Sequence, residues 1–471
     1  MKKLAIILVL MTAFMANGCG KEETKVSADA NISNGKSEEV TDSLIIETGN
    51  TVTSYLTGKQ VDEAIGRQRP ISVMFNNVEE GCPQTGISRA DVVYEAPLAA
   101  NTTRLIGIIE NWHDMKKIGS IRSTRDYYVS FALEFDAIHV HFGQATAYVG
   151  DMLNSDLVDN LSGAVAGIEH PATNTFYRSD DRKAPHNVYA SAEGIMEDIQ
   201  KFEYNLTYDE SYYGKFKFAK DGEDLDYSKY PDATLIYPGG KETGKPNGFS
   251  NVGAYFQYNK DDGKYYRYQY GAEHIDDMTG EQLAYDNVVF QYCYGEVRDK
   301  EGYLAFECFG SDKSNKSIVF TEGKMIEGTW WRDGSNSAPA KYLDENGDRV
   351  VMNQGKTWIC IIWSQYADDV VIEGSSKTAE NSETEMIYIK VLDKLFYNTG
   401  KDVTEEVIES IEAADIDTPY IGTVLSVVDS GIKPTKDMQA NFGSVGAEVV
   451  FYDDGIAVNI DGKWIEFEAS N

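Results

Sequence analysis

Hydrophobic and polar positions divide the chain into stretches with different periodicity. Apolar runs bounded by polar residues predict four early strands, at 71–75, 91–95, 105–112 and 137–143. Aromatic and small residues at helical spacing predict a helix over 125–135, and a second helix is expected over 191–202. Strands and helices therefore mix within this first domain, which extends to about residue 225.

From about residue 230 the pattern becomes mostly that of strands. Asp262-Gly263 separates two tyrosine-rich runs, which is typical of a hairpin. Polar residues at 373–385 have the composition of a linker. Beyond it, the pattern predicts a helix over 403–413 and a three-stranded meander at 448–452, 456–460 and 463–467.

These patterns predict an α+β fold class with six segments. They are a signal peptide (1–18), a disordered acidic spacer (19–57), an α+β N-terminal domain (58–228), a β-rich second domain (229–366), a linker (367–386) and a small C-terminal α+β module (387–471).

The start of the chain predicts export. Lys2 and Lys3 precede an apolar run over 4–15, which is too short to span a bilayer. The Cys in Ala16-Asn17-Gly18-Cys19 resembles that of a bacterial lipobox, although Leu is usual where Ala16 stands. This resemblance implies that Cys19 carries a diacylglyceryl group and that the protein is anchored to the extracytoplasmic face of the cell membrane. An ordinary signal peptide is the alternative.

Charge and cysteines narrow the choice of partners. The formal net charge of -33 repels nucleic acid phosphates, so no nucleic-acid partner is expected. The cysteines have no CxxC spacing, which argues against a zinc or redox motif. Cys293 and Cys308 lie in strand-like runs, and whether they form a disulfide stays open.

One group of residues could form a pocket for an anionic ligand. Its basic and imidazole members come from a polar loop that leads into a helix, from a strand with two His on one face, and from a later loop. Acidic groups could act as acid, base or orienting partners. The candidate residues are Arg122, Arg125, His139, His141, Arg182, His186, Asn187, Asp91 and Glu95.

Two other interpretations of these residues remain open. In the first, the arginines form fixed ion pairs with Asp91, Glu95, Glu134 and Asp136, and the His residues bond backbone carbonyls. In the second, His139 and His141 bind zinc together with Asp91 or Glu95. The common metal and nucleotide motifs are absent, so the sequence predicts no metal and no cofactor.

Many motifs, in order, resemble those of the YerB-like lipoproteins over roughly residues 60–365. In the first domain they are Arg69-Pro70, Asn76-Asn77, Gln84-x-Gly86-x-Ser88-x-Ala90-Asp91, Tyr94-Glu95, Thr103-Arg104, Gly119-x-x-Arg122-Ser123-x-Arg125, Asp136, His139 and Ala184-Pro185-His186-Asn187. In the second they are Arg267, Gly271, His274, Asn287-Val288-Val289, Gly328-x-Trp330 and Gly355-Lys356-Thr357-Trp358. The resemblance implies a membrane-tethered lipoprotein with a layered α/β N-terminal domain and a β-rich second domain, within an α+β fold class. It supplies no reaction, because the family's domains are of unknown function.

The leading hypothesis is a binding or scaffolding lipoprotein of the cell envelope that recognises a cell-wall component or an envelope protein. The alternative is an envelope hydrolase or transferase in which His139, His141 or His186 is the general base and arginines stabilise developing negative charge. A solute-capture lipoprotein is a third possibility, which the β-rich second domain disfavours. Whether the chain is an enzyme is not decided by its sequence.

Overall fold

A computed structural model describes most of the chain beyond the spacer. The described residues are 49–99, 102–163, 166–308, 315–335, 337–374, 387–405, 407–408, 420–428, 433–442, 445–453, 455–460 and 462–469. The predicted signal peptide, Cys19 and most of the predicted spacer lie outside them. None of the helices within these ranges is long and apolar enough to cross a membrane.

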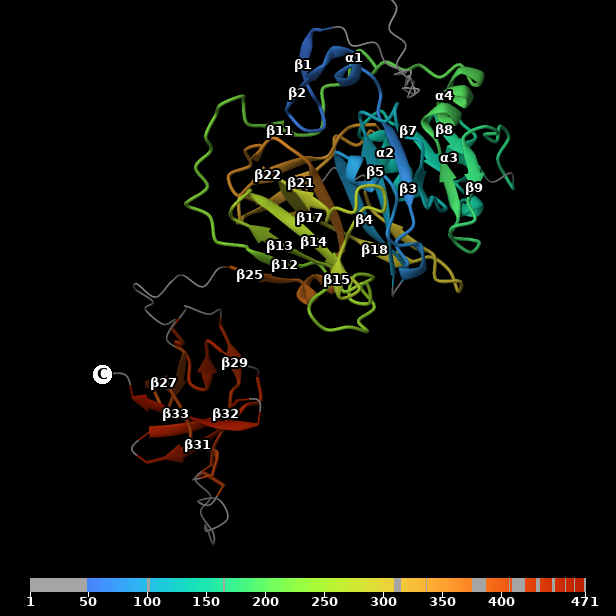
Figure 1. Ribbon diagram of the computed structural model, residues 1–471. Coiled ribbons are helices and arrows are strands. Elements are labelled where there is room, and N and C mark those ends of the chain that lie inside the picture. The colour runs from blue at the N-terminus through green and yellow to red at the C-terminus, as the bar shows by residue number, and fades with distance from the viewer. Residues whose placement is uncertain are drawn as a thin grey trace, which may run out of the picture.

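A ten-stranded mixed sheet forms the centre of the molecule (Figure 1). Its strands, in spatial order, are β22 (Lys341–Asp344), β21 (Lys324–Trp331), β20 (Asn315–Thr321), β17 (Asn287–Cys293), β24 (Thr357–Trp363), β4 (Val92–Ala99), β5 (Thr102–Ile109), β3 (Ile71–Phe75), β7 (Ile138–His141) and β8 (Asn160–Ser162). β24 pairs in parallel with β4. The sheet therefore continues across the boundary predicted at 228/229, and main-chain hydrogen bonds join the two segments.

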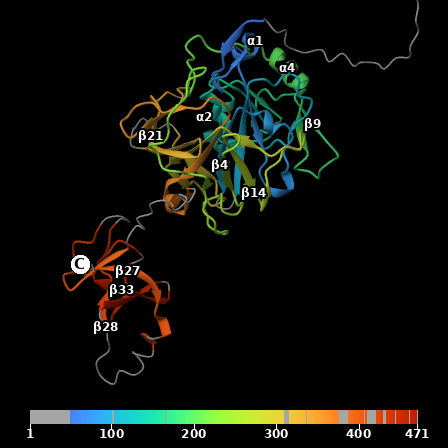
Figure 2. The same ribbon diagram turned by 60° about the vertical axis from the view of Figure 1, so that its left-hand side comes forward.

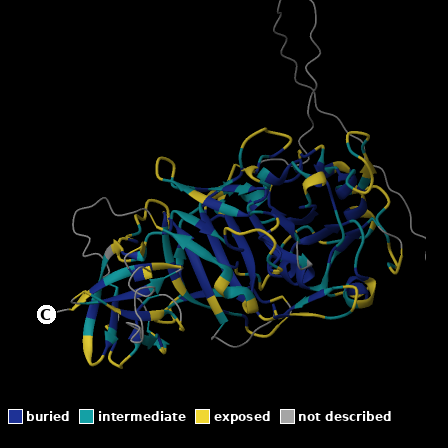
Figure 3. Cartoon of the chain, turned by 90° about the horizontal axis from the view of Figure 1, so that it is seen from below, coloured by how far each residue is buried: buried dark blue, intermediate teal, exposed yellow. Residues whose placement is uncertain are grey.

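Both faces of this sheet are buried, as the dark central strands in Figure 3 show. Along β24, Trp358, Cys360 and Ile362 pack into one hydrophobic cluster, and Ile359 and Ile361 pack into the cluster on the other face. A strand that is buried on both faces has a nearly continuous apolar sequence. This explains why uninterrupted apolar runs predicted the central strands correctly.

Helices and a smaller sheet cover the two faces. α2 (Asp126–Leu133) packs aromatic side chains against one face, and α4 (Ala192–Lys201) packs Ile195 and Ile199 into the cluster on the other. The cluster that contains Ile195 and Ile199 also includes side chains from the smaller sheet. Its strands are β15 (Ala272–Glu273), β14 (Lys264–Gln269), β13 (Tyr255–Asn259), β12 (Leu235–Tyr237) and β25 (Val371–Glu373), with β16 (Ala284–Tyr285) beside β14.

Short elements complete this part of the molecule. They are β1 (Thr51–Thr53), β2 (Gln60–Asp62), α1 (Glu63–Gly66), β6 (Ile118–Gly119), α3 (Thr146–Leu153), β9 (Phe176–Arg178), β10 (Val188–Ala190), β11 (Lys217–Phe218), β18 (Gly295–Val297), β19 (Leu304–Phe306), β23 (Val351–Met352) and the 3₁₀ helices η1 (Glu79–Gly81), η2 (Ile87–Arg89) and η3 (Ser364–Asp369).

The strand-rich α+β class, the two early helices and the hairpin around Asp262-Gly263 are confirmed. The layered arrangement of the first segment stays a prediction. Two segments carry more structure than their composition suggested. β1 lies inside the stretch expected to be spacer, where it pairs with β2, and η3 and β25 occupy the start of the stretch expected to be linker. Short polar strands have little periodicity, so pattern alone does not find them.

The end of the chain forms its own eight-stranded sheet (red in Figure 2). In spatial order its strands are β28 (Tyr420–Thr423), β31 (Glu448–Tyr452), β32 (Gly455–Ile460), β33 (Lys463–Ala469), β27 (Lys394–Asp402), β26 (Tyr388–Val391), β30 (Gln439–Ala440) and β29 (Ser426–Val427). The predicted meander is confirmed as β31, β32 and β33. The predicted helix over 403–413 lies mostly outside the described residues.

Candidate functional site

The polar loop that precedes α2 is held in place by β3 and by β7 with the residues that follow it. The Arg122 amide donates to the Met74 carbonyl at 2.9 Å, and the Thr124 amide donates to the Gly143 carbonyl at 2.9 Å. Below the loop, His139 Nε2 shares a hydrogen bond of 2.8 Å with Thr124 Oγ1. Gly143 has a φ of +94°, and a Cβ there would lie 2.5 Å from Ser123 Oγ. The loop therefore follows a path that requires glycine at position 143.

Four arginines gather around this loop, and we call them the arginine cluster: Arg104 of β5, Arg122 of the loop, Arg125 just before α2, and Arg178 of β9. Each donates to a fixed oxygen of the protein. The bonds are Arg104 Nη1 to the Ser123 carbonyl (2.6 Å), Arg122 Nη1 to the Pro185 carbonyl (3.2 Å), Arg125 Nη1 to the Thr124 carbonyl (2.7 Å) and Arg178 Nη1 to Asn187 Oδ1 (2.8 Å).

The charges in the arginine cluster repel one another. Burial, and then the charges of Arg125 and Arg122, lower the pKa of Arg104 to about 9. Burial lowers the pKa of Arg122 as well, and the charges of Arg125 and Arg178 add to that effect. Arg104 is 5% exposed, and the Nε atoms of Arg104 and Arg122 are buried without a hydrogen-bond partner. Unused donors and uncompensated positive charge favour an anion at this place.

No carboxylate within the described residues lies within 4 Å of an arginine of this cluster. Three of the four acidic groups that the sequence offered as partners are paired with other cations. Glu95 binds Arg267 at 2.8 Å, Asp136 binds Arg69 at 3.2 Å, and Glu134 binds Lys215 and Arg332. Asp126, which follows Arg125 directly, binds Arg298. The expected ion pairs of Arg122, Arg125 and Arg182 with Asp91, Glu95, Glu134 and Asp136 are therefore not formed. The other half of that interpretation, a His bonded to a backbone carbonyl, is confirmed at His141.

His139 and His141 lie beneath the loop and are fully buried. His139 shares its second hydrogen bond with Ser72 at 2.9 Å, and His141 Nδ1 donates to the Gly143 carbonyl at 2.9 Å. Burial lowers the pKa of His139 well below its usual range and lowers that of His141 to about 4. Both rings are thus neutral at pH 7. They hold the loop rather than face solvent.

The zinc interpretation required a carboxylate beside these two His rings. The rings lie 5.1 Å apart, but the described part of the chain holds no group of three or more His, Cys, Asp or Glu that could bind a metal ion. Asp91 and Glu95 are engaged elsewhere. The two-His site with Asp91 or Glu95 is therefore not formed.

The later loop contributes one residue directly to the cluster. Asn187 accepts from Arg178 and donates to the Ser179 carbonyl at 3.0 Å, so it orients that guanidinium. His186 Nδ1 accepts from Asn76 at 2.8 Å. Arg182 donates to the carbonyls of Gly81 and Pro83 at 2.6 and 2.5 Å. Arg122, Arg125 and Asn187 are therefore brought together, whereas Arg182 and His186 hold neighbouring loops.

The two acidic candidates lie away from the arginine cluster. Asp91 precedes β4, and its Oδ2 accepts from the Glu110 amide at 3.0 Å. Burial raises the pKa of Asp91. Glu95 accepts from Arg267 at 2.8 Å, Trp358 Nε1 at 3.2 Å and Thr103 Oγ1 at 2.8 Å. Glu95 and Arg267 are both fully buried. Glu95 thus joins β4 to β24 of the central sheet through Trp358, and to β14 of the smaller sheet through Arg267.

Sequence reasoning missed two members of the arginine cluster. Arg104 stands in the Thr103-Arg104 motif, directly before the apolar run at 105–112. It was therefore interpreted as the residue that bounds a strand and not as part of a site. Arg178 belongs to a three-residue strand and had no motif around it.

The open question of a disulfide between Cys293 and Cys308 is also answered. Within the described residues, Cys82, Cys293, Cys308 and Cys360 are all free thiols.

Comparisons with known proteins agree with this architecture. Residues 56–205 match the N-terminal domain, and residues 246–359 the C-terminal domain, of a family described as "Protein of unknown function (DUF3048)". The chain is 26% identical over 318 residues to "Putative lipoprotein YerB" of Bacillus subtilis (strain 168), covering 67% of this chain and 88% of that protein.

A solved structure matches over the same part of the molecule. The crystal structure of the YerB protein from Bacillus subtilis superposes with a TM-score of 0.56 at 25% identity, covering 68% of this chain and 99% of that one. The two matched domains span the central sheet described above. Together these matches show that the chain belongs to the YerB-like family, which carries the N- and C-terminal DUF3048 domains.

Proposed function

We propose that this protein is a lipid-anchored binding protein of the bacterial cell envelope, and that the arginine cluster holds a compact anionic group of its ligand. The lipid anchor is proposed on Cys19, because that residue follows a basic, apolar and small-residue start. The family supports this part, since the Bacillus subtilis relative is named as a lipoprotein. The proposed location is the outer face of the cell membrane.

One observation carries the binding role. In a chain with 76 acidic residues, four arginines meet with no described carboxylate within 4 Å, while nearby carboxylates pair with other cations. Leaving positive charge uncompensated and partly buried costs free energy. A bound anion would remove that cost, and guanidinium groups suit carboxylate or phosphate because they donate in a planar fork.

The charge of the whole protein limits the size of the anion. A net charge of -33 repels an extended polyanion before it can reach the site. A single carboxylate, phosphate or diphosphate on an otherwise neutral molecule experiences much less of that repulsion. The ligand is therefore a small anionic group presented by a wall fragment or an envelope protein, not an anionic polymer.

The hydrolase or transferase alternative has no observation in its favour. A general base must reach the proton that it removes. His139 and His141 are buried with protein partners, and His186 is bound to Asn76. We keep binding, with a scaffolding role in the envelope, as the proposed activity.

The location is tested by Cys19→Ser. The variant should lose the lipid and either appear in the medium or accumulate as unprocessed precursor. Fractionation with detection of the acyl chain by mass spectrometry measures this. Wild-type protein that carries no lipid and sits in the cytosol with its first eighteen residues intact would overturn the anchor.

The binding role is tested by recovering partners from membranes. Lipidated wild-type protein should co-purify with envelope material that the double variant Arg122→Gln/Arg125→Gln does not retain. Arg89→Gln is the matched control, because Arg89 already pairs with Asp114 on the surface of the same segment. Equal recovery by wild type and the double variant would show that the cluster is not the binding site.

A further inference from the structure

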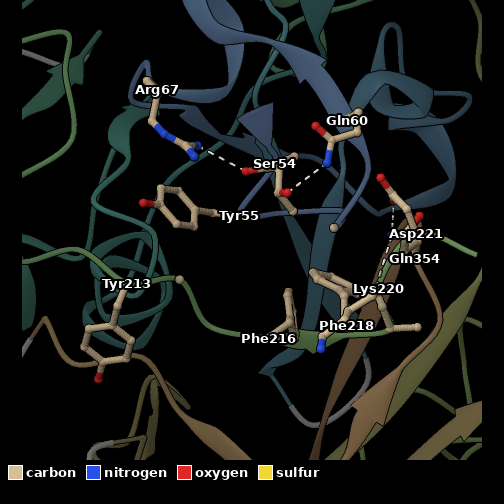
Figure 4. A pocket seen from close by; sticks show the side chains of 14 residues that line it. Ser54, Tyr55, Gln60, Arg67, Tyr213, Phe216, Phe218, Lys220, Asp221 and Gln354 are labelled. Carbon is tan, nitrogen blue, oxygen red and sulfur yellow. Dashed lines mark hydrogen bonds between the residues drawn. The ribbon is translucent and has the colours of Figure 1, made fainter. Parts of the chain in front are cut away.

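A second candidate site lies on a different part of the molecule. A cavity of about 340 Å³ opens between the leading hairpin, Arg67 just after α1, and the stretch that leads into the second segment (Figure 4). This volume is at the lower end of the range for small-molecule sites. The residues that line it are Thr53, Ser54, Tyr55, Gly58, Gln60, Arg67, Tyr213, Gly214, Phe216, Phe218, Ala219, Lys220, Asp221 and Gln354. It is therefore built where three stretches of chain meet.

Aromatic rings supply the apolar part of the wall. Tyr55 is held at right angles to Tyr208 and Tyr212, with ring centroids 5.3 and 5.2 Å apart, so its orientation is fixed. Tyr213 is 52% exposed, although aromatic side chains of its size are usually more buried. Phe218 packs against Gly58, where a Cβ would lie 2.5 Å from the ring. Tyr55 and Phe218 are thus held in place before any ligand arrives.

Polar groups line another part of the cavity (Figure 4). Gln60 Nε2 donates to Thr53 Oγ1 at 2.9 Å, and Gln354 Nε2 donates to Asp221 Oδ1 at 2.8 Å. Neither amide oxygen has a partner within the described residues. The site thus combines flat apolar faces with acceptors at their edges. A saccharide ring has the complementary surface, because its C–H faces are apolar and its hydroxyl edges donate hydrogen bonds.

Two cations in the lining favour a negatively charged group on the ligand. The Arg67 guanidinium lies 4.7 Å from the centroid of the Tyr55 ring and is anchored by the Thr53 carbonyl at 3.1 Å. Lys220 is exposed, and no carboxylate in the described part of the chain lies within 4 Å of its ammonium. The one acidic side chain of the lining, Asp221, already accepts from Gln354. Because the carboxylate of Asp221 keeps its own charge, the lining carries two positive charges and one negative charge.

We propose that this cavity binds a saccharide that carries a carboxylate, with its ring against Tyr213 and its acidic substituent toward Arg67 and Lys220. The proposal does not depend on the arginine cluster, which lies on other elements. It assigns the leading hairpin a role in recognition as well as in folding. Its ligand class is an acidic sugar unit such as occurs in wall glycan.

The test is calorimetric titration of the full-length protein with two disaccharide probes. One is the N-acetylglucosamine–N-acetylmuramic acid disaccharide, which carries a lactyl carboxylate, and the other is N,N′-diacetylchitobiose, which is neutral. Wild type should bind the acidic probe more tightly. Tyr213→Ala should weaken binding of both probes about tenfold, and Lys220→Gln should remove the preference for the acidic one.

Controls separate this site from the arginine cluster and from loss of folding. Tyr294→Ala removes an equally exposed tyrosine outside the cavity and should bind like wild type. Arg89→Gln, which removes an arginine paired with Asp114 at the surface, should also bind like wild type. Loss of the acidic preference in Arg122→Gln/Arg125→Gln but not in Lys220→Gln would assign the acidic probe to the arginine cluster and overturn this proposal. Thermal unfolding of each variant confirms that it is folded. Absence of saccharide binding at millimolar concentration, or equal binding by wild type and a folded Tyr213→Ala, would overturn the proposal.

Discussion

Glu110 carries a carboxyl group whose protonation should affect stability. It is 3% exposed, accepts from Ser54 Oγ at 3.0 Å and lies near Asp91. Burial, and then the charge of Asp91, raise its pKa to about 8. Between the ordinary carboxyl pKa and that value, the folded protein holds a proton that the unfolded chain releases. This stabilisation is complete below the unfolded pKa and is lost as the pH rises through about 8.

The variant Glu110→Gln isolates this contribution. We expect the free energy of unfolding of wild type to fall relative to that of the variant as the pH rises from about 4.5 to about 8. The fall should be at most about 1.4 kcal/mol per pH unit. Urea unfolding at a series of pH values measures it, with exposed Glu80→Gln as the control. A difference that does not change with pH would mean that Glu110 titrates normally.

Some residues of the site could be predicted from the sequence, but the ion pairs around them could not. Arg122, Arg125 and Asn187 could be named because they stand in polar loops beside glycine or proline. Which carboxylate pairs with which cation depends on contacts between distant residues. Glu95 and Arg267 are separated by 172 positions, and nothing near either of them indicates the other. The unpaired state of the arginines could therefore not be predicted.

At the level of elements, the buried pair of Glu95 on β4 and Arg267 on β14 ties the smaller sheet to the central one. Arg267→Met should destabilise the protein by about 3–5 kcal/mol, because it leaves a carboxylate buried without a counter-charge. Urea unfolding measures the loss. Glu95→Gln/Arg267→Met should recover part of it, since that double variant removes both charges.

Arg89→Gln is the control for this experiment. Arg89 pairs with Asp114 at the surface, so its loss should cost less than about 1 kcal/mol. If Arg267→Met loses no more than Arg89→Gln, the buried pair does not connect the two sheets in the way described.

The loop before α2 gives a second prediction for an element. Gly143→Ala should displace the loop, because the new Cβ would meet Ser123 Oγ at 2.5 Å and the φ of +94° is strained for alanine. We expect a loss of about 1–3 kcal/mol in stability and weaker anion binding. Gly347→Ala shares the positive φ, but its Cβ would meet nothing within 4 Å, so it should keep anion binding. Equal anion binding by the two variants would show that the path of the loop is unimportant.

Elements were predictable where burial on both faces gives a continuous apolar run, as in β3, β17 and β24. Which strands pair with one another in the sheet was not predictable. The parallel pairing of β24 with β4 joins residues far apart in sequence, and periodicity carries no information about strand order. The sequence therefore indicated two segments but not the sheet that they share.

On the scale of the whole molecule, the last sheet has its own hydrophobic core and its strands pair with one another. Residues 373–385 have the composition of a linker. Limited proteolysis should therefore cut there first and yield two fragments that both remain folded, as judged by circular dichroism and hydrogen exchange. Unfolding of the larger fragment on cleavage would mean that the C-terminal module is part of the main core.

The central claim, an anion site made by the arginine cluster, is tested most directly by calorimetric titration with inorganic pyrophosphate. Wild type and Arg89→Gln should bind it with an affinity that falls as salt is added, and Arg122→Gln/Arg125→Gln should bind at least about tenfold more weakly. If wild type shows no binding at millimolar pyrophosphate, or if the double variant binds as wild type does, the arginine cluster is not an anion site.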